Sequence, residues 1–530
     1  MADQRDTILI TGEELTPEQL MVLGKGGAII ELSADALSSV ERSKEVIDAI
    51  LNDDTRVIYG VNTGFGELKS EVIPRNKLCE LQENLIRSHA SGVGEPLSPQ
   101  KTRMLMAIRI NVLARGNSGI SVETLQRFID AFNKSLLPYV PEKGTVGACG
   151  DLAPLAHLSL GMMGEGDMWN PDTEQFGNAN EVLESHGLQA IELGPKEGLS
   201  LINGAQLITA IGTLALEKAK AIARQADVVA AITLDVFQGT NAAFDQRIHD
   251  ARPHIGQVKV ARRFRSLIHS KVFPSQIFEY YESHKKVQDN YSLRCIPQVH
   301  GIANDTIDFV SGILTTEMNS STDNPLVFIK EKEIISGGNF HGEYPAKALD
   351  YLAIGIHEIA NMSERRINRM CNRSKYEIPA FLVKDSGLNS GFMIAHCTAA
   401  ALVSENKVLT HPSSVDSIST SAGSEDHVSM GGFSARKALT VVEHVEQVIA
   451  IELLAACQGL EFLKPYKTTK PLQAVYDLVR TVAKPWDKDR FMAPDINAVT
   501  KLLQEEKVWA CVEPYIQDYN KTMDVKDHKE

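Results

Sequence analysis

A run of small residues, Gly144–His157, constrains the fold more than any other part of the 530-residue sequence. Its centre, Ala148-Cys149-Gly150, follows Gly147, and glycine permits backbone turns that are closed to other residues. The apolar residues after Asp151 predict a short helix with Asp151 as its N-cap. Cys149 would then lie at a helix N-terminus, where partial positive charge depresses a thiol pKa and favours electrophile or anion chemistry.

Long helical patterns dominate the rest of the chain. Residues 205 to about 237 contain no proline and carry apolar residues on most faces, which predicts a buried helix about 45 Å long. Similar patterns recur at 346–370, 390–408 and 434–463, and Thr16, Ser33 and Ser121 predict the starts of earlier helices. We therefore expect a mainly α fold: an elongated central bundle of long helices with an irregular N-terminal portion that carries the small-residue loop.

The expected domain organisation follows this division. Residues 1–200 form the N-terminal portion, residues 201–463 the long-helix bundle and residues 464–530 a C-terminal helical extension. A single thin bundle would not cover the apolar circumference of the 205–237 helix, which indicates an oligomer.

Composition excludes several classes of partner. Acidic residues outnumber basic ones by 68 to 54, which opposes binding to a nucleic acid backbone. The seven cysteines form no C-x-x-C pair and no zinc spacing, so we expect reduced thiols, no metal and a cytoplasmic protein. The apolar stretch 448–457 is too short to span a membrane and contains Glu452.

Several polar motifs admit both a structural and a functional reading. Tyr59–Gly66 is rich in glycine and reads as a surface turn or a mobile lid. His89 follows Ser88 in a helical pattern, where a lone histidine is usually structural. Asn203 would lie at the entrance of the long helix as its cap, and Glu425 stands in a polar segment typical of a solvated loop.

Read in chain order, these motifs resemble the aromatic amino acid ammonia-lyase family from about residue 57 to about 432. In that family Ala-Ser-Gly closes on itself to form a methylidene-imidazolone electrophile. The resemblance implies that Ala148, Cys149 and Gly150 form this group, with no diffusible cofactor. Cys149 stands where serine is usual, and elimination of hydrogen sulfide instead of water would leave the same methylidene. The alternative is a buried structural cysteine in an inactive loop.

The resemblance also implies roles for other residues. Tyr59 would act as acid or base on the substrate's β-carbon, which requires nearby positive charge or helix ends to lower its pKa. Asn203 would bind the prosthetic group or the substrate carboxylate, and Phe340, in Gly337–Gly342, would shield the site from water. In the segment Gln288–Arg294, Arg294 would bind the carboxylate bidentately, Tyr291 would be catalytic and Gln288 would contact substrate. Asn290 replaces a usual proline, which leaves the rigidity of this turn open.

The positions that would contact the aromatic ring of the substrate (the ring-reading residues) resemble those of the histidine-specific members of the family. His89 after Ser88, and Glu425 in Ser424–Ser429, each correspond to positions that contact the imidazole ring there. The resemblance implies deamination of L-histidine to trans-urocanate and ammonia by a homotetramer with shared active sites. A tyrosine or phenylalanine ammonia-lyase, an aminomutase, and a non-catalytic oligomeric helical protein in which Cys149 does not cyclise are the alternatives.

Overall fold

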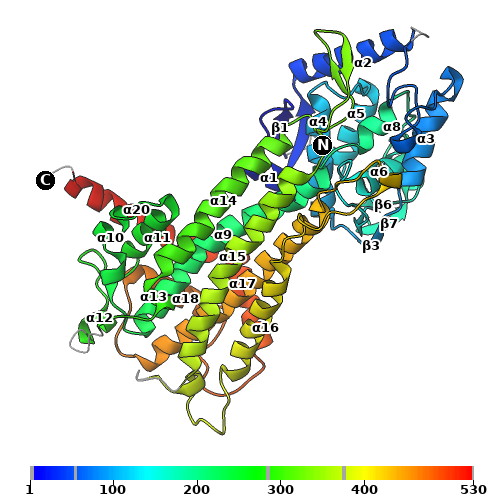
Figure 1. The fold of residues 1–530 in the computed structure, drawn as a ribbon. Coiled ribbons are helices and arrows are strands. Elements are labelled where there is room, and N and C mark those ends of the chain that lie inside the picture. Colours follow the sequence, from blue (N-terminus) through cyan, green and yellow to red (C-terminus); the bar gives the residue numbers. More distant parts are fainter. Residues whose placement is uncertain (1–4, 53–55, 282–286, 373–377, 528–530) are drawn as a thin grey trace. The chain divides into compact units, whose positions relative to one another are not determined.

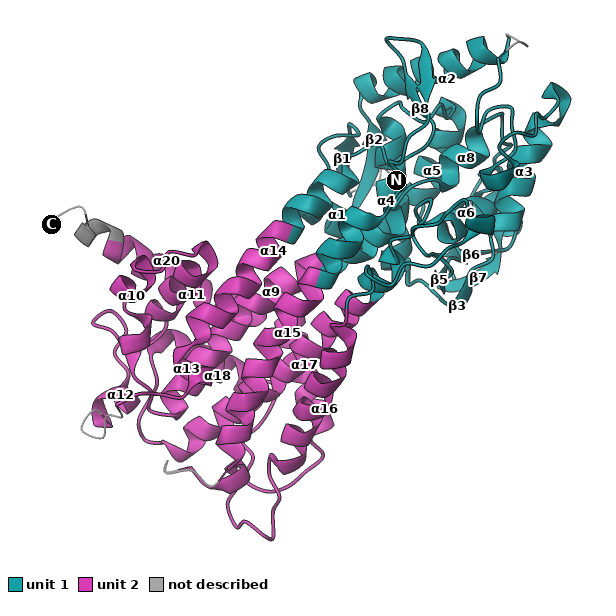
Figure 2. Cartoon of the chain, viewed as in Figure 1, with its two compact units in different colours: residues 1–215, 310–350, 412–436 teal, residues 216–309, 351–411, 437–530 magenta. Residues whose placement is uncertain are grey.

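Helices make up most of the computed structural model, which describes residues 5–52, 56–281, 287–372 and 378–527 (Figure 1). The chain divides into two compact units (Figure 2). Unit 1 comprises residues 1–215, 310–350 and 412–436, and unit 2 comprises residues 216–309, 351–411 and 437–530. The predicted mainly α fold is confirmed. Each unit is assembled from three separate segments, and the division into three consecutive portions stays a prediction.

Four long helices belong partly to each unit. They are α9 (Gln206–Val236), α14 (Ile296–Met318), α15 (Glu343–Cys371) and α17 (Gly431–Phe462). The sequence pattern predicted all of them except α14. The large apolar side chains of α9 are buried within the single chain, and Leu216, Ile222 and Val228 are at most 1% exposed. The helix is therefore buried as predicted, but the argument that it needs a second subunit to cover it is wrong.

Unit 1 combines short helices with small sheets. The three predicted helix starts in it are confirmed, since the hydroxyls of Thr16, Ser33 and Ser121 each accept a hydrogen bond from the first turn of the following helix. The remaining elements of unit 1 are β1 (Asp6–Ile10), α1 (Pro17–Gly24), β2 (Ala28–Leu32), α2 (Ala34–Leu51), α3 (Leu78–His89), β3 (Val93–Pro96), α4 (Pro99–Ala114), α5 (Val122–Asn133), β4 (Leu137–Pro138), β5 (Pro141–Lys143), α6 (Leu152–Met162), β6 (Asp167–Asn170), β7 (Gln175–Asn178), α7 (Ala179–Ser185), α8 (Glu197–Ile202), β8 (Leu326–Phe328) and β9 (Glu333–Ile335).

The sheets of unit 1 are short and mostly antiparallel. Strands β1 and β2 pair in parallel, with Asp6 opposite Ala28, while β4, β6 and β7 form an antiparallel sheet. The antiparallel pair of β3 and β5 lies directly before the small-residue loop. This pairing and helix α6 hold the two ends of the loop in place.

Unit 2 is a helical bundle built around its share of the four long helices. Its other helices are α10 (Gln246–Asp250), α11 (Ile255–Arg265), α12 (Gln276–Tyr280), α13 (Tyr291–Arg294), α16 (Met393–Leu409), α18 (Lys470–Arg480), α19 (Ala493–Gln504) and α20 (Lys507–Asp527). A completely buried ion pair, Arg366 with Glu452, crosses the interior of this bundle. Within the described ranges, no helix combines the length and the hydropathy that a membrane span requires.

Candidate active site

The small-residue loop lies between β5 and α6 and is fixed by the backbone that joins α8 to α9. The Gly204 amide donates to the carbonyl of Cys149 at 3.2 Å, and the Asp151 amide donates to the carbonyl of Gly204 at 2.7 Å. Gly150 has a φ of 73°, and a β-carbon there would lie 2.1 Å from the Gly204 carbonyl oxygen. Only glycine fits this position, so the loop is held in a tight turn as predicted.

The Cys149 thiol contacts a carboxylate that is distant in sequence. Its Sγ donates a hydrogen bond to Oε1 of Glu425 at 2.9 Å, across 276 residues of chain. Burial, followed by the hydrogen bond and the negative charge of Glu425, strongly raises the pKa of this thiol. The predicted depression of the Cys149 pKa is therefore wrong, because burial and a carboxylate outweigh the effect of the helix N-terminus.

Asp151 occupies the N-cap position of α6, but its side chain makes no capping bond to that helix. Its Oδ2 accepts instead from the Ile208 amide at 3.0 Å, in the first turn of α9. Burial raises the pKa of the Asp151 carboxyl to about 7. Asp151 therefore ties the loop to α9, which is a stronger constraint than the local cap predicted from the sequence.

Tyr59 lies in the glycine-rich segment, and its hydroxyl accepts from the Gly66 amide at 3.3 Å. Burial raises the pKa of this phenol, the Gly66 hydrogen bond acts in the opposite direction, and electrostatic interactions with Cys149 and Glu425 raise the pKa further. The lowered pKa that an acid–base role of Tyr59 requires is therefore not found within the described residues, and that role stays a prediction. The same interactions show that Tyr59 lies near both Cys149 and Glu425.

A cavity of about 730 Å³ in unit 1 brings most of the predicted site residues together. Tyr59, Ala148, Cys149, Asn203, Phe340 and Glu425 all contribute to its lining. Other polar side chains complete the wall, namely Lys69, Asn324, Ser336, His341, Ser424, Asp426 and His427. The cavity therefore places the loop thiol opposite groups that can donate, accept and exchange protons.

Asn203 lines this cavity from the end of α8. It is the C-cap residue of α8, so the expectation that it caps the long helix α9 is wrong. Its carbonyl accepts from Nη1 of the fully buried Arg109 at 2.7 Å, which fixes its backbone. Its side-chain oxygen is buried without a hydrogen-bond partner in the described chain. Asn203 therefore carries an unused acceptor at the cavity.

His89 ends helix α3 and does not itself line the cavity. Its Nδ1 lies 3.0 Å from the Ser88 hydroxyl, so the Ser88–His89 pair predicted from the sequence is formed. Burial lowers the pKa of His89, while the charge of Glu425 acts in the opposite direction. The two predicted ring-reading residues therefore interact electrostatically, and burial favours a neutral imidazole.

Gln288, Tyr291 and Arg294 belong to unit 2 and contribute nothing to the lining of this cavity. Arg294 stacks over the Tyr291 ring at 4.8 Å, and its buried Nε has no hydrogen-bond partner among the described residues. Tyr291 is 69% exposed. The Asn290 carbonyl accepts hydrogen bonds from the backbone amides of Leu293 and Arg294, both at 3.0 Å. These bonds fix the turn at the position where the family usually has proline.

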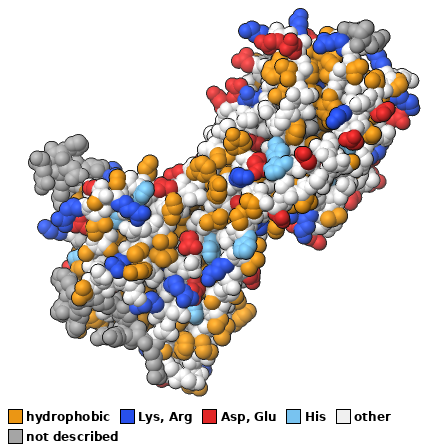
Figure 3. All heavy atoms as spheres, viewed as in Figure 1, with side chains coloured by type: hydrophobic (Ala, Val, Ile, Leu, Met, Phe, Trp, Pro, Cys, Tyr) orange, Lys and Arg blue, Asp and Glu red, His pale blue; other side chains and the backbone are white. Residues whose placement is uncertain are grey.

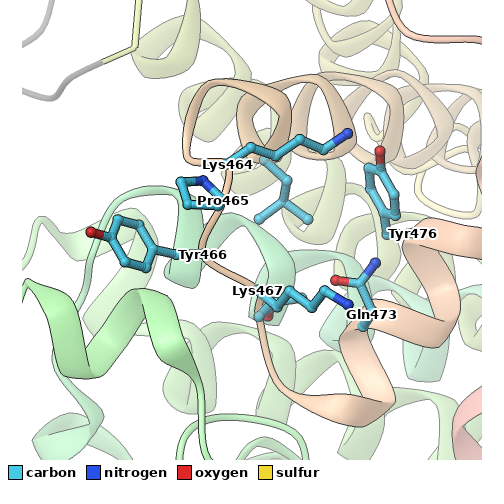
Figure 4. A pocket seen from close by; sticks show the side chains of 8 residues that line it. Lys464, Pro465, Tyr466, Lys467, Gln473 and Tyr476 are labelled. Atoms are coloured by element: carbon cyan, nitrogen blue, oxygen red, sulfur yellow. The ribbon is translucent and has the colours of Figure 1, made fainter.

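A second cavity, of about 420 Å³, lies in unit 2 between the end of α17 and helix α18 (Figure 4). Lys464, Tyr466 and Tyr476 are among its lining side chains. Tyr476 donates to Oε1 of Glu461 at 2.5 Å, and Lys464 pairs with the same carboxylate. None of the predicted site residues lines this cavity, and the Lys464 ammonium group is already paired with Glu461.

The sequence did not reveal Thr420 as part of the site. Its hydroxyl donates to Oε2 of Glu425 at 2.6 Å, which leaves Oε1 for the Cys149 thiol. A main-chain bridge between Thr420 and Glu425 supports this arrangement. The available signal was a hydroxyl five residues before Glu425, but the surrounding polar residues gave no reason to choose it.

Comparison with known proteins identifies close relatives over nearly the whole chain. The family description "aromatic amino acid lyase" matches residues 15–481, a longer range than the motifs indicated. Histidine ammonia-lyase of Homo sapiens is 65% identical over 512 residues, which cover 97% of this chain and 78% of that one. The crystal structure of histidine ammonia-lyase from Trypanosoma cruzi superposes with a TM-score of 0.89 at 54% identity, over 96% of this chain and 95% of that one. Tyrosine aminomutase from Streptomyces globisporus gives a TM-score of 0.89 at 34% identity, over 96% and 99% of the two chains.

Proposed function

The chain belongs to the aromatic amino acid lyase family, and we propose that it deaminates L-histidine to trans-urocanate and ammonia. The 65% identity to a histidine ammonia-lyase over 97% of this chain carries the assignment to histidine. The site supports it, because Glu425 lines the cavity and its charge acts on His89, the other predicted imidazole-reading residue. Aminomutase activity is less well supported, since the sequence identity to tyrosine aminomutase is only 34%.

The prosthetic group of this reaction would be a methylidene-imidazolone made from Ala148, Cys149 and Gly150. The loop fits such a group, because Gly150 adopts a φ that favours glycine and packs where no β-carbon has room. The backbone hydrogen bonds to Gly204 hold Cys149 and Asp151, the two residues on either side of Gly150. When present, the group supplies an electrophile that makes the departing nitrogen a better leaving group.

The remaining residues would bind the substrate and move its protons. Glu425 and His89 would hold the imidazole of the substrate. Asn203 would form a hydrogen bond with the substrate carboxylate or with the prosthetic group, and Phe340 would limit the access of water. Tyr59 would remove the β-proton, which requires a cation near the phenolate because burial and Glu425 raise its pKa within the chain. Arg294 would supply that charge while it binds the substrate carboxylate, and Gln288 and Tyr291 would adjoin it.

Replacing His89 by leucine tests the substrate assignment. Wild-type protein should deaminate histidine in strong preference to tyrosine and phenylalanine, because a phenyl ring leaves the polar groups of the pocket unpaired. We expect His89→Leu to reduce the preference for histidine over phenylalanine about ten- to a hundredfold, since a stranded buried polar group costs about 1–3 kcal/mol. Steady-state kcat/KM for the three amino acids measures this. An unchanged preference in His89→Leu would reject the ring-reading role, and equal turnover of all three by wild type would reject the assignment to histidine.

Assembly into a homotetramer would complete the site with residues from another subunit. Arg294 and Tyr291 lie in unit 2, outside the lining of the cavity, and Tyr291 is largely exposed. The parts of α14 and α15 that belong to unit 2 also expose large apolar side chains, namely Ile302, Phe309, Tyr351 and Ile354. Hydrophobic side chains lie among charged ones on the face shown in Figure 3. Such exposed apolar residues on neighbouring helices suit contact with a second copy of the chain.

Phe309→Asp tests this assembly. A charge on the exposed apolar face of α14 should shift the protein from a tetramer to smaller species in sedimentation velocity, and turnover should fall with it. Phe309→Leu keeps the apolar character and should sediment like wild type. A wild-type protein that is active as a stable monomer would contradict shared active sites.

A further inference from the structure

The contact between Cys149 and Glu425 gives the glutamate a position that substrate binding alone does not explain. One oxygen of Glu425, Oε1, accepts from the Cys149 thiol at 2.9 Å, while the other accepts from Thr420 at 2.6 Å. The carboxylate is thus held against the sulfur by contacts within the chain itself. It lies beside the one atom by which this loop differs from the Ala-Ser-Gly loop usual in the family.

We propose that Glu425 carries the proton that allows sulfur to leave Cys149 when the loop closes. This step rests on the closure proposed above. Gly150 nitrogen first bonds to the Ala148 carbonyl carbon, and the carbonyl oxygen departs as water with the amide hydrogens of Gly150 and Cys149. Glu425 then takes the Cα proton of Cys149, and the electron pair of that C–H bond forms the Cα=Cβ bond. The Cβ–S bond breaks with its electron pair on sulfur, and Glu425 returns the proton to sulfur. The products are the closed loop, one water and one hydrogen sulfide, and the Glu425 carboxylate is regenerated.

The protonation state of the Cys149 thiol is consistent with this route. Burial and Glu425 raise its pKa, so sulfur remains protonated at neutral pH. A protonated sulfur can depart as hydrosulfide or hydrogen sulfide, whereas a thiolate would have to leave as a dianion. The raised pKa also suppresses competing thiolate chemistry such as oxidation or disulfide exchange.

Glu425 is better placed for this role than Asp151, the carboxyl group that directly follows Gly150. Asp151 uses Oδ2 to accept from the Ile208 amide at 3.0 Å, and no hydrogen bond joins it to the sulfur in the described chain. Glu142, in β5 directly before the loop, lies outside the cavity lining and pairs with Lys143, so it provides a matched control for charge near the loop.

The rate of closure in newly synthesised full-length chain tests the proposal without any measurement of turnover. Intact mass spectrometry would follow the loss of water and hydrogen sulfide, and a fluorescent thiol-reactive probe would trap the released sulfide. We expect Glu425→Gln to close at least about 10²-fold more slowly than wild type, the usual contribution of a positioned acid–base group. Glu425→Asp should recover part of the rate because it keeps a carboxylate, and Glu142→Gln should close like wild type.

The outcomes separate this inference from the proposed function. If wild-type chain never loses mass, the prosthetic group proposed from Ala148, Cys149 and Gly150 is wrong. If wild type closes and Glu425→Gln closes at the same rate, only the role of Glu425 is overturned. A third outcome is that Glu425→Gln and Glu425→Asp both close the loop equally slowly while both unfold at the wild-type temperature. The Glu425 side chain would then act through packing, and its proton-carrying role would also be overturned.

Discussion

Cys149→Ala should lose histidine turnover by at least about 10³-fold, the largest functional effect expected for a single substitution in this chain. Alanine has no leaving group on its β-carbon, so the loop cannot form a methylidene. A loss of this size corresponds to about 4 kcal/mol of transition-state stabilisation. The Gly150 turn and its bonds to Gly204 do not involve the thiol, so the fold should be unaffected. Steady-state assay with histidine, alongside intact mass, measures both consequences.

Two cysteine variants make this result interpretable. Cys149→Ser restores the residue usual in the family and should keep turnover, with loss of a second water in place of hydrogen sulfide. Cys79→Ala removes an exposed thiol on α3 and should change neither mass loss nor turnover. Substantial activity in Cys149→Ala would show that the reaction does not depend on an electrophile built from this loop.

Local sequence signals predicted the helices and the loop because the forces concerned are local. Hydroxyl caps at Thr16, Ser33 and Ser121 fix helix starts through bonds spanning three residues. The unbroken apolar pattern of α9 likewise reflects a helix buried on most sides. At Gly150 the requirement for a residue without a β-carbon is a property of the backbone turn itself.

The features that the sequence did not predict depend on contacts between distant segments. The pKa of Cys149 rises because Glu425, 276 residues away, approaches its sulfur in a buried setting. Asp151 bonds to Ile208 instead of its own helix, since α9 packs beside the loop. The missed role of Thr420 has the same origin, because it matters only through the orientation of Glu425. A motif identifies which residues meet, but their ionisation depends on what surrounds them.

Arg366→Met should destabilise unit 2 by about 3–5 kcal/mol, because it leaves the Glu452 carboxylate buried without its charge partner. The Arg366 guanidinium binds Glu452 bidentately at 2.6 and 2.7 Å, and both side chains are 0% exposed. Its third bond, from Nη1 to the Ser292 carbonyl at 3.2 Å, reaches the segment that carries Tyr291 and Arg294. We therefore expect the substitution to loosen that segment as well as the bundle.

Denaturant unfolding at one fixed protein concentration measures this effect, since assembly makes apparent stability depend on concentration. Lys259→Met, which removes an exposed ion pair with Asp308 (N–O distance 3.8 Å), provides the control and should cost less than about 1 kcal/mol. Adding Glu452→Leu to Arg366→Met should recover part of the loss, because the stranded charge is then removed as well. If Arg366→Met proves no more destabilising than Lys259→Met, water must reach Glu452 in solution and the pair is not an obligatory part of the core. Recovery in the double variant would instead establish that the destabilisation comes from burying one charge alone.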